Sequence, residues 1–223
     1  MLVDGRGCWI SHCEGSIIAH GQPALFLDRD DVLLEDPGYL HRASQVQLLG
    51  GAVEVVKWAN GQSIPTIVVT NQSGIARGIF SWDDFHAVNQ RMMEILREAG
   101  ASLDAVVACA WHENGLPHLQ SPAHLWRKPN PGMFLAARDA FGCELSSSWM
   151  VGDRQTDMDA AFHAGLQGGV LVGHPNSVDQ LWLREGNASS FEVLTVETMN
   201  GVLKKLAENF SLENKSWSRV DAF

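Results

Sequence analysis

The sequence predicts an α/β fold in which helices cover both faces of a mostly parallel central sheet. Two patterns predict this fold class. Short apolar runs alternate along the chain with segments of helical periodicity. Several of these runs end in polar residues, as expected where parallel strands form a binding site at their carboxyl ends. With 223 residues, 45% of them hydrophobic, the chain can bury one substantial core.

Six apolar runs are expected to form the strands of the sheet. Each is short and lies between segments of different periodicity, as buried strands in such folds do. The expected ranges are residues 24–28, 66–70, 105–110, 149–152, 169–172 and 191–195.

Two of the intervening helices have clear ends. Residues 81–99 begin with a Ser81–Asp84 capping box and stop before Gly100. Apolar residues recur in this helix at helical spacing, which predicts packing against the core rather than a binding surface. They are Phe85, Val88, Met92, Leu96 and Ala99. The second helix begins at Asn130 and Pro131 and ends at Gly142.

The alternation of strands and helices predicts a Rossmann-like three-layer sandwich within residues 23–209. Residues 1–22 are expected to form an N-terminal extension, and residues 210–223 a polar C-terminal tail. The extension holds a loose group of potential metal ligands, but a flexible segment is the favoured interpretation. These ligands are Cys8, His12, Cys13 and His20.

Four segments at predicted strand ends have the chemistry of phosphoryl transfer, namely residues 26–30, 69–71, 127–129 and 151–157. Asp28 can attack phosphorus, and Asp30 can protonate the departing oxygen and later deprotonate water. Asp153 would complete a magnesium site with Asp28, because hard oxygen ligands suit this cation. Lys128 and Thr70 would neutralise and orient the phosphoryl oxygens.

Each of these residues also has a purely structural interpretation. Asp28 taken alone could cap a helix, and Thr70 could be an ordinary β-branched strand residue. The combination of Asp28 with the other strand-end groups favours catalysis over capping. Asp157 lies four residues after Asp153 and is expected to cap a helix or support the site rather than bind metal directly.

The order and spacing of the four segments resemble the haloacid dehalogenase superfamily of aspartate-nucleophile phosphatases. More narrowly, the chain resembles the family of D-glycero-D-manno-heptose 1,7-bisphosphate phosphatase and histidinol-phosphate phosphatase. The matching motifs are residues 28–30, 36–39, 70–78 and 127–133, and the run from Thr70 is the most specific of them. The resemblance covers roughly residues 23–209.

The resemblance implies a role for each matching residue. Asp28 would be the nucleophile and Asp30 the general acid and base. The magnesium ligands would be Asp28, the backbone carbonyl of Asp30, and Asp153, while Thr70 and Lys128 would stabilise the phosphoryl group. Substrate contacts would involve Asp36, Gly38, Tyr39, Asn71, Gln72, Ser73, Arg127 and Arg154. The family usually has lysine at the last of these positions, so arginine keeps the charge and changes the reach.

Cap domains are common insertions in this superfamily. The chain has no long insertion after the first strand or between the second and third motifs. We therefore expect no large cap domain and an open site, at which the loops of residues 36–39 and 113–126 select the substrate.

Asp31 departs from the family pattern, which usually has glycine after the second aspartate. Aspartate is one of the few residues that tolerate a left-handed backbone, so the fold can accommodate it. A third carboxylate beside Asp28 and Asp30 would couple to their titration and could reduce activity or shift its pH optimum.

The loop before Arg127 also departs from the family pattern. The family often binds structural zinc there through a Cys-x-His pair and a Cys-x-Cys pair. The matching positions are Cys109, Trp111, His124 and Trp126, so most ligands are lost and a metal-free loop is favoured. A rearranged zinc site from Cys109, His112, His118 and His124 is the alternative.

Composition indicates an intracellular enzyme. The net charge is −10 and the pI is near 5.3, which argues against bulk binding of nucleic acid or of an anionic membrane. Four scattered cysteines do not form a disulfide framework, and no apolar run has the length of a membrane span or the form of a secretory signal. We expect a cytoplasmic monomer.

These observations predict a magnesium-dependent phosphatase that acts on a small phosphorylated metabolite through an aspartyl-phosphate. The resemblance implies the 7-phosphate of D-glycero-D-manno-heptose 1,7-bisphosphate as the substrate, and Arg127 beside Lys128, which suits a second anionic group, favours this bisphosphate over histidinol phosphate. Histidinol-phosphate phosphatase is the alternative of the same class. A catalytically silent phosphosugar-binding protein is the alternative from another class.

Overall fold

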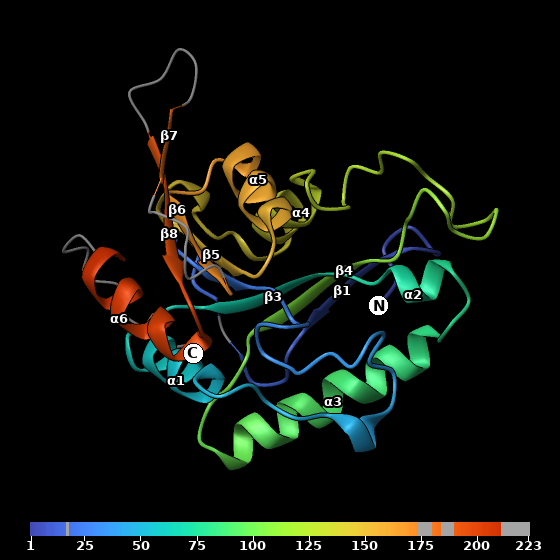
Figure 1. Ribbon diagram of the computed structural model, residues 1–223, viewed down its shortest axis with the longest axis horizontal. Coiled ribbons are helices and arrows are strands. Elements are labelled where there is room, and N and C mark those ends of the chain that lie inside the picture. Colours follow the sequence, from blue (N-terminus) through green and yellow to red (C-terminus); the bar gives the residue numbers. More distant parts are fainter. Residues whose placement is uncertain (17, 174–179, 184–189, 211–223) are drawn as a thin grey trace, which may run out of the picture.

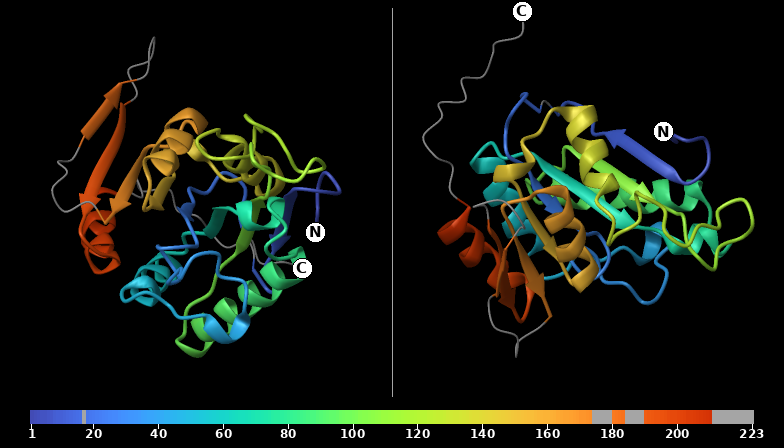
Figure 2. Two further views of the ribbon diagram at one scale, coloured as in Figure 1. Left: turned by 45° about the vertical axis from the view of Figure 1, so that its right-hand side comes forward. Right: turned by 90° about the horizontal axis from the view of Figure 1, so that it is seen from above.

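The computed structural model is a three-layer α/β domain (Figures 1 and 2). The structure describes residues 1–16, 18–173, 180–183 and 190–210. In this part of the chain one eight-stranded sheet has the strand order β1-β4-β3-β2-β5-β6-β8-β7. The strands are β1 (Cys8–His12), β2 (Leu25–Leu27), β3 (Thr66–Asn71), β4 (Ala105–Cys109), β5 (Trp149–Gly152), β6 (Gly168–Val172), β7 (Gln180–Leu183) and β8 (Ser190–Val196).

The helices of the described residues lie mainly between the strands. They are η1 (Ala43–Gln45), α1 (Ala52–Gly61), α2 (Ser73–Ala76), α3 (Trp82–Glu98), α4 (Gly132–Phe141), η2 (Leu145–Ser147), α5 (Gln155–Ala164) and α6 (Met199–Asn209). All six predicted strands form and pair in parallel, whereas the outer strands β1 and β7 are antiparallel. The predicted fold class is confirmed, and the residues that the structure describes form no large cap domain.

Two hydrophobic cores separate the sheet from its helices. Side chains of one strand alternate between faces, so Leu25 and Leu27 of β2 contribute to one core and Phe26 to the other. Buried residues of α1, α3 and α6 belong to the first core, and those of α4 and α5 to the second. Figure 1 shows the two sets of helices on opposite faces of the sheet.

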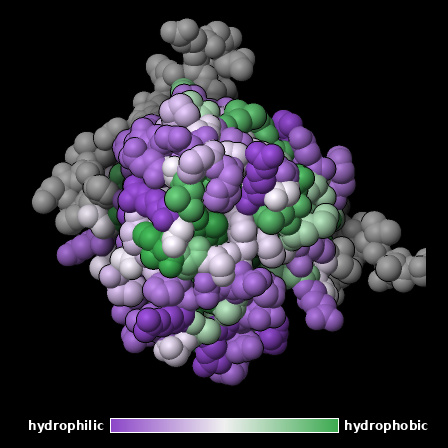
Figure 3. Space-filling view, turned by 90° about the vertical axis from the view of Figure 1, so that its right-hand side faces the viewer, coloured by the Kyte–Doolittle hydropathy of each residue, from purple (hydrophilic) through white to green (hydrophobic). Residues whose placement is uncertain are grey.

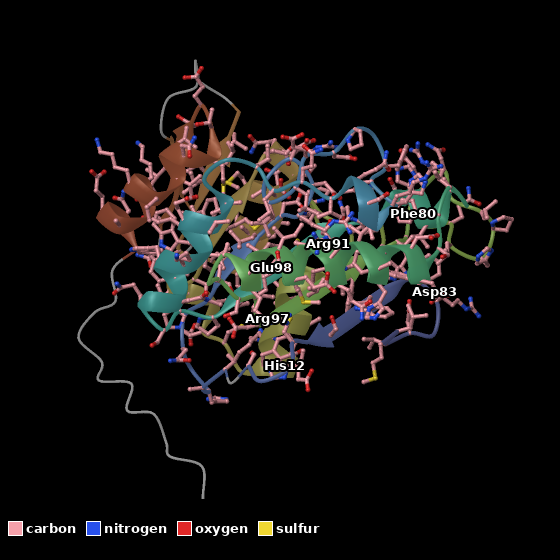
Figure 4. All side chains as sticks on the ribbon, turned by 90° about the horizontal axis from the view of Figure 1, so that it is seen from below. His12, Phe80, Asp83, Arg91, Arg97 and Glu98 are labelled. Atoms are coloured by element: carbon pink, nitrogen blue, oxygen red, sulfur yellow. The ribbon has the colours of Figure 1, made fainter. Side chains whose placement is uncertain are left out.

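The helix predicted at residues 81–99 is α3, and its capping box forms as expected. Ser81 caps the helix and accepts a hydrogen bond from the Asp84 N–H, while Asp84 accepts one from the Ser81 N–H. The outer face of α3 carries charged side chains such as Arg97 and Glu98 (Figure 4). α4 begins one residue later than predicted, after Pro131, and ends at the predicted glycine.

The N-terminal segment is part of the sheet, so the prediction of a flexible extension is wrong for Cys8–His12. These residues form β1, which pairs with the outer edge of β4. The side chain of Trp9 stacks on Trp82 with 5.5 Å between ring centroids, which fixes β1 against α3. The first twenty residues contain no sustained apolar stretch, and the open edge of β4 supplies the partner that makes this segment a strand.

Phe210 ends the described part of the C-terminal region. Its buried ring packs on Trp58 of α1 at 6.0 Å, so it belongs to the core rather than to a tail. The rest of the predicted tail lies outside the described residues, and the proposed domain limits stay predictions. Among the helices described, none has the length and apolar character needed to cross a bilayer.

The strand order positions the site. From β2, the chain adds β3 and β4 on one side of the sheet and β5 and β6 on the other. Ligands of open α/β folds bind at the carboxyl ends of the strands where this reversal occurs. Asp28 directly follows β2, and its N–H donates to the Val151 carbonyl of the neighbouring β5 at 2.9 Å.

Candidate active site

A pocket of about 480 Å³ opens at the carboxyl ends of β2, β3 and β5. It is lined by every residue that the sequence predicted for catalysis, substrate binding or metal binding. These are Asp28, Asp30, Asp36, Gly38, Tyr39, Thr70, Asn71, Gln72, Ser73, Arg127, Lys128, Asp153 and Arg154. Segments separated by more than a hundred residues thus meet at one site, while the role of each residue stays a proposal.

Lys128 links two buried carboxylates at the bottom of this pocket. Its Nζ lies 2.9 Å from Asp28 Oδ2 and 2.5 Å from Asp157 Oδ1, and it donates to the Val69 carbonyl at 2.9 Å. The other oxygen of Asp28, Oδ1, accepts the Arg29 N–H at 2.7 Å. Lys128 and Asp157 are almost fully buried, so their pairing is shielded from solvent.

Burial and neighbouring charges shift the pKa values of this group. Burial raises the pKa of Asp28 to about 7, an effect that Lys128 opposes and that Asp157 and Asp30 reinforce. Burial lowers the pKa of Lys128, but Asp157 and Asp28 outweigh it and hold the pKa above its ordinary value. Burial and the nearby Asp157 also raise the pKa of Asp153. Lys128 is therefore charged, and a cation near Asp28 and Asp153 would favour their carboxylate forms.

Asp157 has the supporting position predicted for it. Its Oδ2 accepts the Arg154 N–H at 3.0 Å, which caps α5, and its Oδ1 pairs with Lys128. The close approach of Asp157 to β5 requires Gly152, because a Cβ at Gly152 would lie 2.4 Å from the Asp157 Cβ. The glycine before Asp153 therefore makes room for the residue that holds the lysine.

Asp30 is held by Arg29 and Gln72. Arg29 donates from Nε to Asp30 Oδ1 at 2.9 Å and from Nη2 to Oδ2 at 3.2 Å. Gln72 Nε2 lies 2.8 Å from Asp30 Oδ2 and 2.9 Å from Thr70 Oγ1. Arg29 is 1% exposed, and its guanidinium lies over the Phe85 ring at 5.1 Å.

Sequence reasoning missed the contribution of Arg29. A charged residue between two aspartates was a weak signal, because a strand-end arginine is more often exposed than buried. Besides Asp30, its guanidinium contacts α3 through Phe85 and through Asn89 Oδ1, which accepts from Nη1 at 3.3 Å.

Asn71 connects β3 to the loop that carries the lysine. Its Nδ2 donates to the Lys128 carbonyl and its Oδ1 accepts the Lys128 N–H, each at 3.1 Å. This pair of bonds aims Lys128 into the pocket. Arg127 lies beside it and donates to the Trp111 carbonyl at 3.4 Å.

The loop after β2 forms the opposite wall. Asp36 Oδ1 accepts the N–H groups of Gly38 and Leu40 at 3.0 and 2.9 Å, which shapes the turn that presents Tyr39. The Tyr39 hydroxyl accepts from Arg77 Nη1 at 2.7 Å. Arg77 therefore supports this wall through Tyr39.

Asp31 adopts the left-handed backbone expected of a position that usually has glycine, with φ of +58°. Its Oδ1 accepts the Asp36 N–H at 3.4 Å. Burial is the largest cause that raises the pKa of Asp31, and backbone hydrogen bonding to Asp36 opposes it. The fold therefore accommodates this aspartate, and its carboxylate contacts the loop of residues 36–39 through Asp36.

The histidines of the alternative zinc set in the loop have other partners. His112 Nδ1 accepts the Asn114 N–H at 2.9 Å, and its Nε2 lies 3.2 Å from Arg77. Among the described residues, neither His112 nor His118 belongs to a group of three or more potential ligands. His124 of this set interacts with the Cys109 thiol.

The carboxylates in the pocket fit a divalent cation. Asp28, Asp153 and Asp157 each offer an oxygen within 4.8 Å of the others, and oxygen donors suit magnesium. Three carboxylates face one buried lysine, which leaves excess negative charge. Arg154 reduces it little, because its side chain is 71% exposed.

The chain matches the HAD-hydrolase-like family model over residues 125–181. It is 45% identical over 166 residues to a D-glycero-β-D-manno-heptose-1,7-bisphosphate 7-phosphatase of Mesorhizobium japonicum, covering 74% of this chain and 76% of the relative. It is 39% identical over 150 residues to the corresponding α-anomer enzyme of Burkholderia mallei, covering 67% and 79%.

Solved structures share the fold of this chain. A structure described as a HAD-like phosphatase of Mesorhizobium loti has a TM-score of 0.82 and 38% identity, covering 96% of this chain and 99% of the other. D,D-heptose 1,7-bisphosphate phosphatase of B. bronchiseptica, complexed with magnesium and phosphate, has a TM-score of 0.67 and 24% identity, covering 84% and 99%.

The fold and the site define a HAD-like hydrolase. Within that class, the chain belongs to the family of D-glycero-D-manno-heptose-1,7-bisphosphate 7-phosphatases.

Proposed function

We propose that this chain is a magnesium-dependent phosphatase that removes the 7-phosphate of D-glycero-D-manno-heptose 1,7-bisphosphate through an aspartyl-phosphate. The main support is one pocket in which a buried lysine contacts Asp28 while a second aspartate, Asp30, is held at its edge. Family membership supports the substrate class.

Asp28 is the proposed nucleophile. One of its oxygens attacks phosphorus, the bond from phosphorus to the sugar oxygen breaks, and the phosphoryl group stays on Asp28. Lys128 and the Arg29 N–H hold the carboxylate in position, at 2.9 and 2.7 Å. Lys128 is charged, so it also offsets negative charge on the phosphoryl oxygens.

Asp30 is the proposed general acid and base. It gives its proton to the departing sugar oxygen, and it then takes a proton from the water that attacks the aspartyl-phosphate and releases inorganic phosphate. Arg29 and Gln72 fix the direction of its carboxylate, which is 23% exposed and so remains open to the pocket.

Asp28 and Asp153, with the Asp30 carbonyl, would hold the magnesium ion, which would neutralise phosphate charge. Asp157 would support the site without binding the ion, because one of its oxygens pairs with Lys128 and the other accepts the Arg154 N–H that caps α5.

Arg127 and Arg154 support a substrate with a second phosphate. Both line the pocket beside Lys128, and guanidinium groups bind phosphate oxygens in pairs. Tyr39 and the turn formed by Asp36 would contact the sugar between the two phosphates. We further propose that the enzyme acts as a cytoplasmic monomer.

The test is magnesium-dependent phosphate release from both anomers of the heptose bisphosphate, from histidinol phosphate and from other sugar phosphates. Asp28→Asn should abolish release, and Asp139→Asn, at a side chain that is 68% exposed, is the matched control and should retain it. We expect a preference for one heptose anomer.

Other outcomes would contradict the proposal in different ways. Faster turnover of histidinol phosphate would assign the related phosphatase activity. Binding of the bisphosphate without phosphate release by the folded wild type would indicate a silent phosphosugar-binding protein.

A further inference from the structure

Strand β1 brings two buried cysteines together, and one of them, Cys109, pairs with Asn71 of the adjacent strand β3. Cys8 lies directly opposite Cys109 of β4, and the two are 3% and 0% exposed. The neighbouring Ala110 N–H donates to the Gly7 carbonyl at 2.8 Å, so Cys8 and Cys109 form the next, non-hydrogen-bonded pair. Side chains of such pairs approach closely on one face of the sheet.

A histidine and a carboxylate complete this cluster. Asp4, Cys8 and His124 each offer a ligand atom within 4.8 Å of the others, and His124 also interacts with the Cys109 thiol. Asp4 comes from the turn before β1, and His124 from the loop that precedes α4. Three separate segments therefore supply the four side chains.

Trp111 holds the histidine and the carboxylate in place. Its ring stacks on His124 with 4.9 Å between centroids and an angle of 8°. Its Nε1 donates to Asp4 Oδ2 at 2.9 Å. Gly7 makes room for this ring, because a Cβ there would lie 2.6 Å from Trp111 Nε1. The tryptophan thus positions two members of the cluster.

A turn-forming role explains only part of this arrangement. Asp4 Oδ1 accepts the N–H groups of Arg6, Gly7 and Cys8, each at 2.9 Å, which is a typical aspartate turn. It does not account for two buried thiols and an imidazole gathered at the same point. Two sulfur ligands, one nitrogen and one oxygen are a donor set suited to tetrahedral zinc.

We propose that Cys8, Cys109, His124 and Asp4 bind a structural zinc ion. Ligand atoms of a tetrahedral zinc site lie roughly 3.3–3.8 Å apart, so those of Asp4, Cys8 and His124, which lie within 4.8 Å of one another, and the Cys109 thiol would draw closer together around the ion. Each thiol loses its proton to solvent on binding, and the ion bonds to both thiolates.

The site differs from the one considered in the loop alone, because half of its ligands come from the N-terminal segment. It would tie β1 to the loop that leads into Arg127 and Lys128. Figure 3 views the end of the molecule to which this loop belongs, where hydrophilic and hydrophobic groups are mixed on the surface. By contrast, the two thiols of the cluster are buried.

Metal analysis of the purified chain tests the proposal. After incubation with zinc and dialysis, the wild type should hold about one zinc ion per chain, and Cys8→Ala should hold less than roughly a tenth of that. Cys143→Ala is the matched control, because Cys143 is also 3% exposed and lies outside the cluster. It should bind zinc like the wild type.

Cobalt provides a readout that needs no variant. The cobalt-loaded wild type should show thiolate-to-metal charge transfer and the intense visible bands of tetrahedral coordination. Zinc should also raise the unfolding midpoint of the wild type and of Cys143→Ala, but not that of Cys8→Ala. None of these measurements depends on phosphatase activity, so they fail or succeed independently of the proposed function.

Three results would overturn the site. The first is a wild type without bound zinc and without a tetrahedral cobalt spectrum. The second is equal zinc content in Cys8→Ala and Cys143→Ala. The third is a stable Cys8–Cys109 disulfide that persists under reducing conditions and takes up no metal.

Discussion

Adding one methyl group at Gly152 should disable the site without touching a proposed catalytic residue. In Gly152→Ala the new Cβ would lie 2.4 Å from Asp157 Cβ and 2.5 Å from its Cγ. Ordinary contact begins near 3.4 Å, so Asp157 must move by about 1 Å. The side chain cannot simply rotate away, because the clash involves its first carbon atom.

The displacement weakens the contacts that Asp157 makes. A shift of about 1 Å would stretch its 2.5 Å contact with Lys128 or its 3.0 Å bond from the Arg154 N–H beyond hydrogen-bond range. Overpacking costs about 1–3 kcal/mol, and a lost hydrogen bond to a charged group costs about 1.5–3 kcal/mol. Since movement relieves part of the clash, we expect a loss of roughly 2–4 kcal/mol in the free energy of unfolding. Misplacement of Lys128 should lower the phosphatase rate by about 100-fold.

Urea unfolding and magnesium-dependent phosphate release measure the two effects. Gly61→Ala is the matched control, because no heavy atom lies within 4 Å of the added carbon at that exposed helix end. It should retain wild-type activity and stability, or gain a few tenths of a kcal/mol. If Gly152→Ala were as stable and as active as Gly61→Ala, the packing of Asp157 against Gly152 would not position Lys128.

Three further substitutions test other parts of the structure by urea unfolding. Arg29→Met removes the buried partner of Asp30 and should lower the free energy of unfolding by about 2–4 kcal/mol. Arg138→Met, at an exposed ion pair, is the control and should lower it by less than about 0.5 kcal/mol. Equal losses in the two variants would refute the role of burial. Asp31 has a left-handed backbone with φ of +58°, so Asp31→Gly should be tolerated. The β-branched variant Asp31→Val should lose about 1–3 kcal/mol of the free energy of unfolding. Wild-type stability of Asp31→Val would contradict the left-handed conformation at this position. Hydrogen bonds from Ser81 lower the pKa of Asp84, so its contribution is complete above the ordinary value of 3.8 and disappears as pH falls through the lower folded value. Asp84→Asn should therefore be less stable than the wild type at neutral pH and equal to it in acid, and a difference that did not vary with pH would exclude the charge as its source.

The strands and the main helix were predictable because their signals are local. The buried runs of β3 and β5 and the capping box of α3 depend on residues that are neighbours in sequence. The strand-end motifs were predictable for a similar reason, since polar residues that end apolar runs must meet when those strands are parallel neighbours.

β1 could not be predicted in this way, because its partner is the free edge of a strand almost a hundred residues later. Pairing between distant segments depends on which edge the completed sheet leaves open, and no local pattern states this. The association of Cys8 with Cys109 follows from the same pairing.

The fold class and the set of groups at the carboxyl ends of the strands, from Asp28 to Asp153, could be predicted from the amino-acid sequence alone. Hydrophobic periodicity and the polar residues at strand ends are local features of the sequence, so they are recognisable before the fold is known. The groups that those residues contact become apparent from the three-dimensional packing. The burial of Arg29 against α3, the choice of Asp157 as the partner of Lys128, and the meeting of Cys8 with His124 all depend on packing between separate elements. Such contacts arise only when the sheet and its helices come together, because each involves side chains that are distant in sequence and adjacent in space.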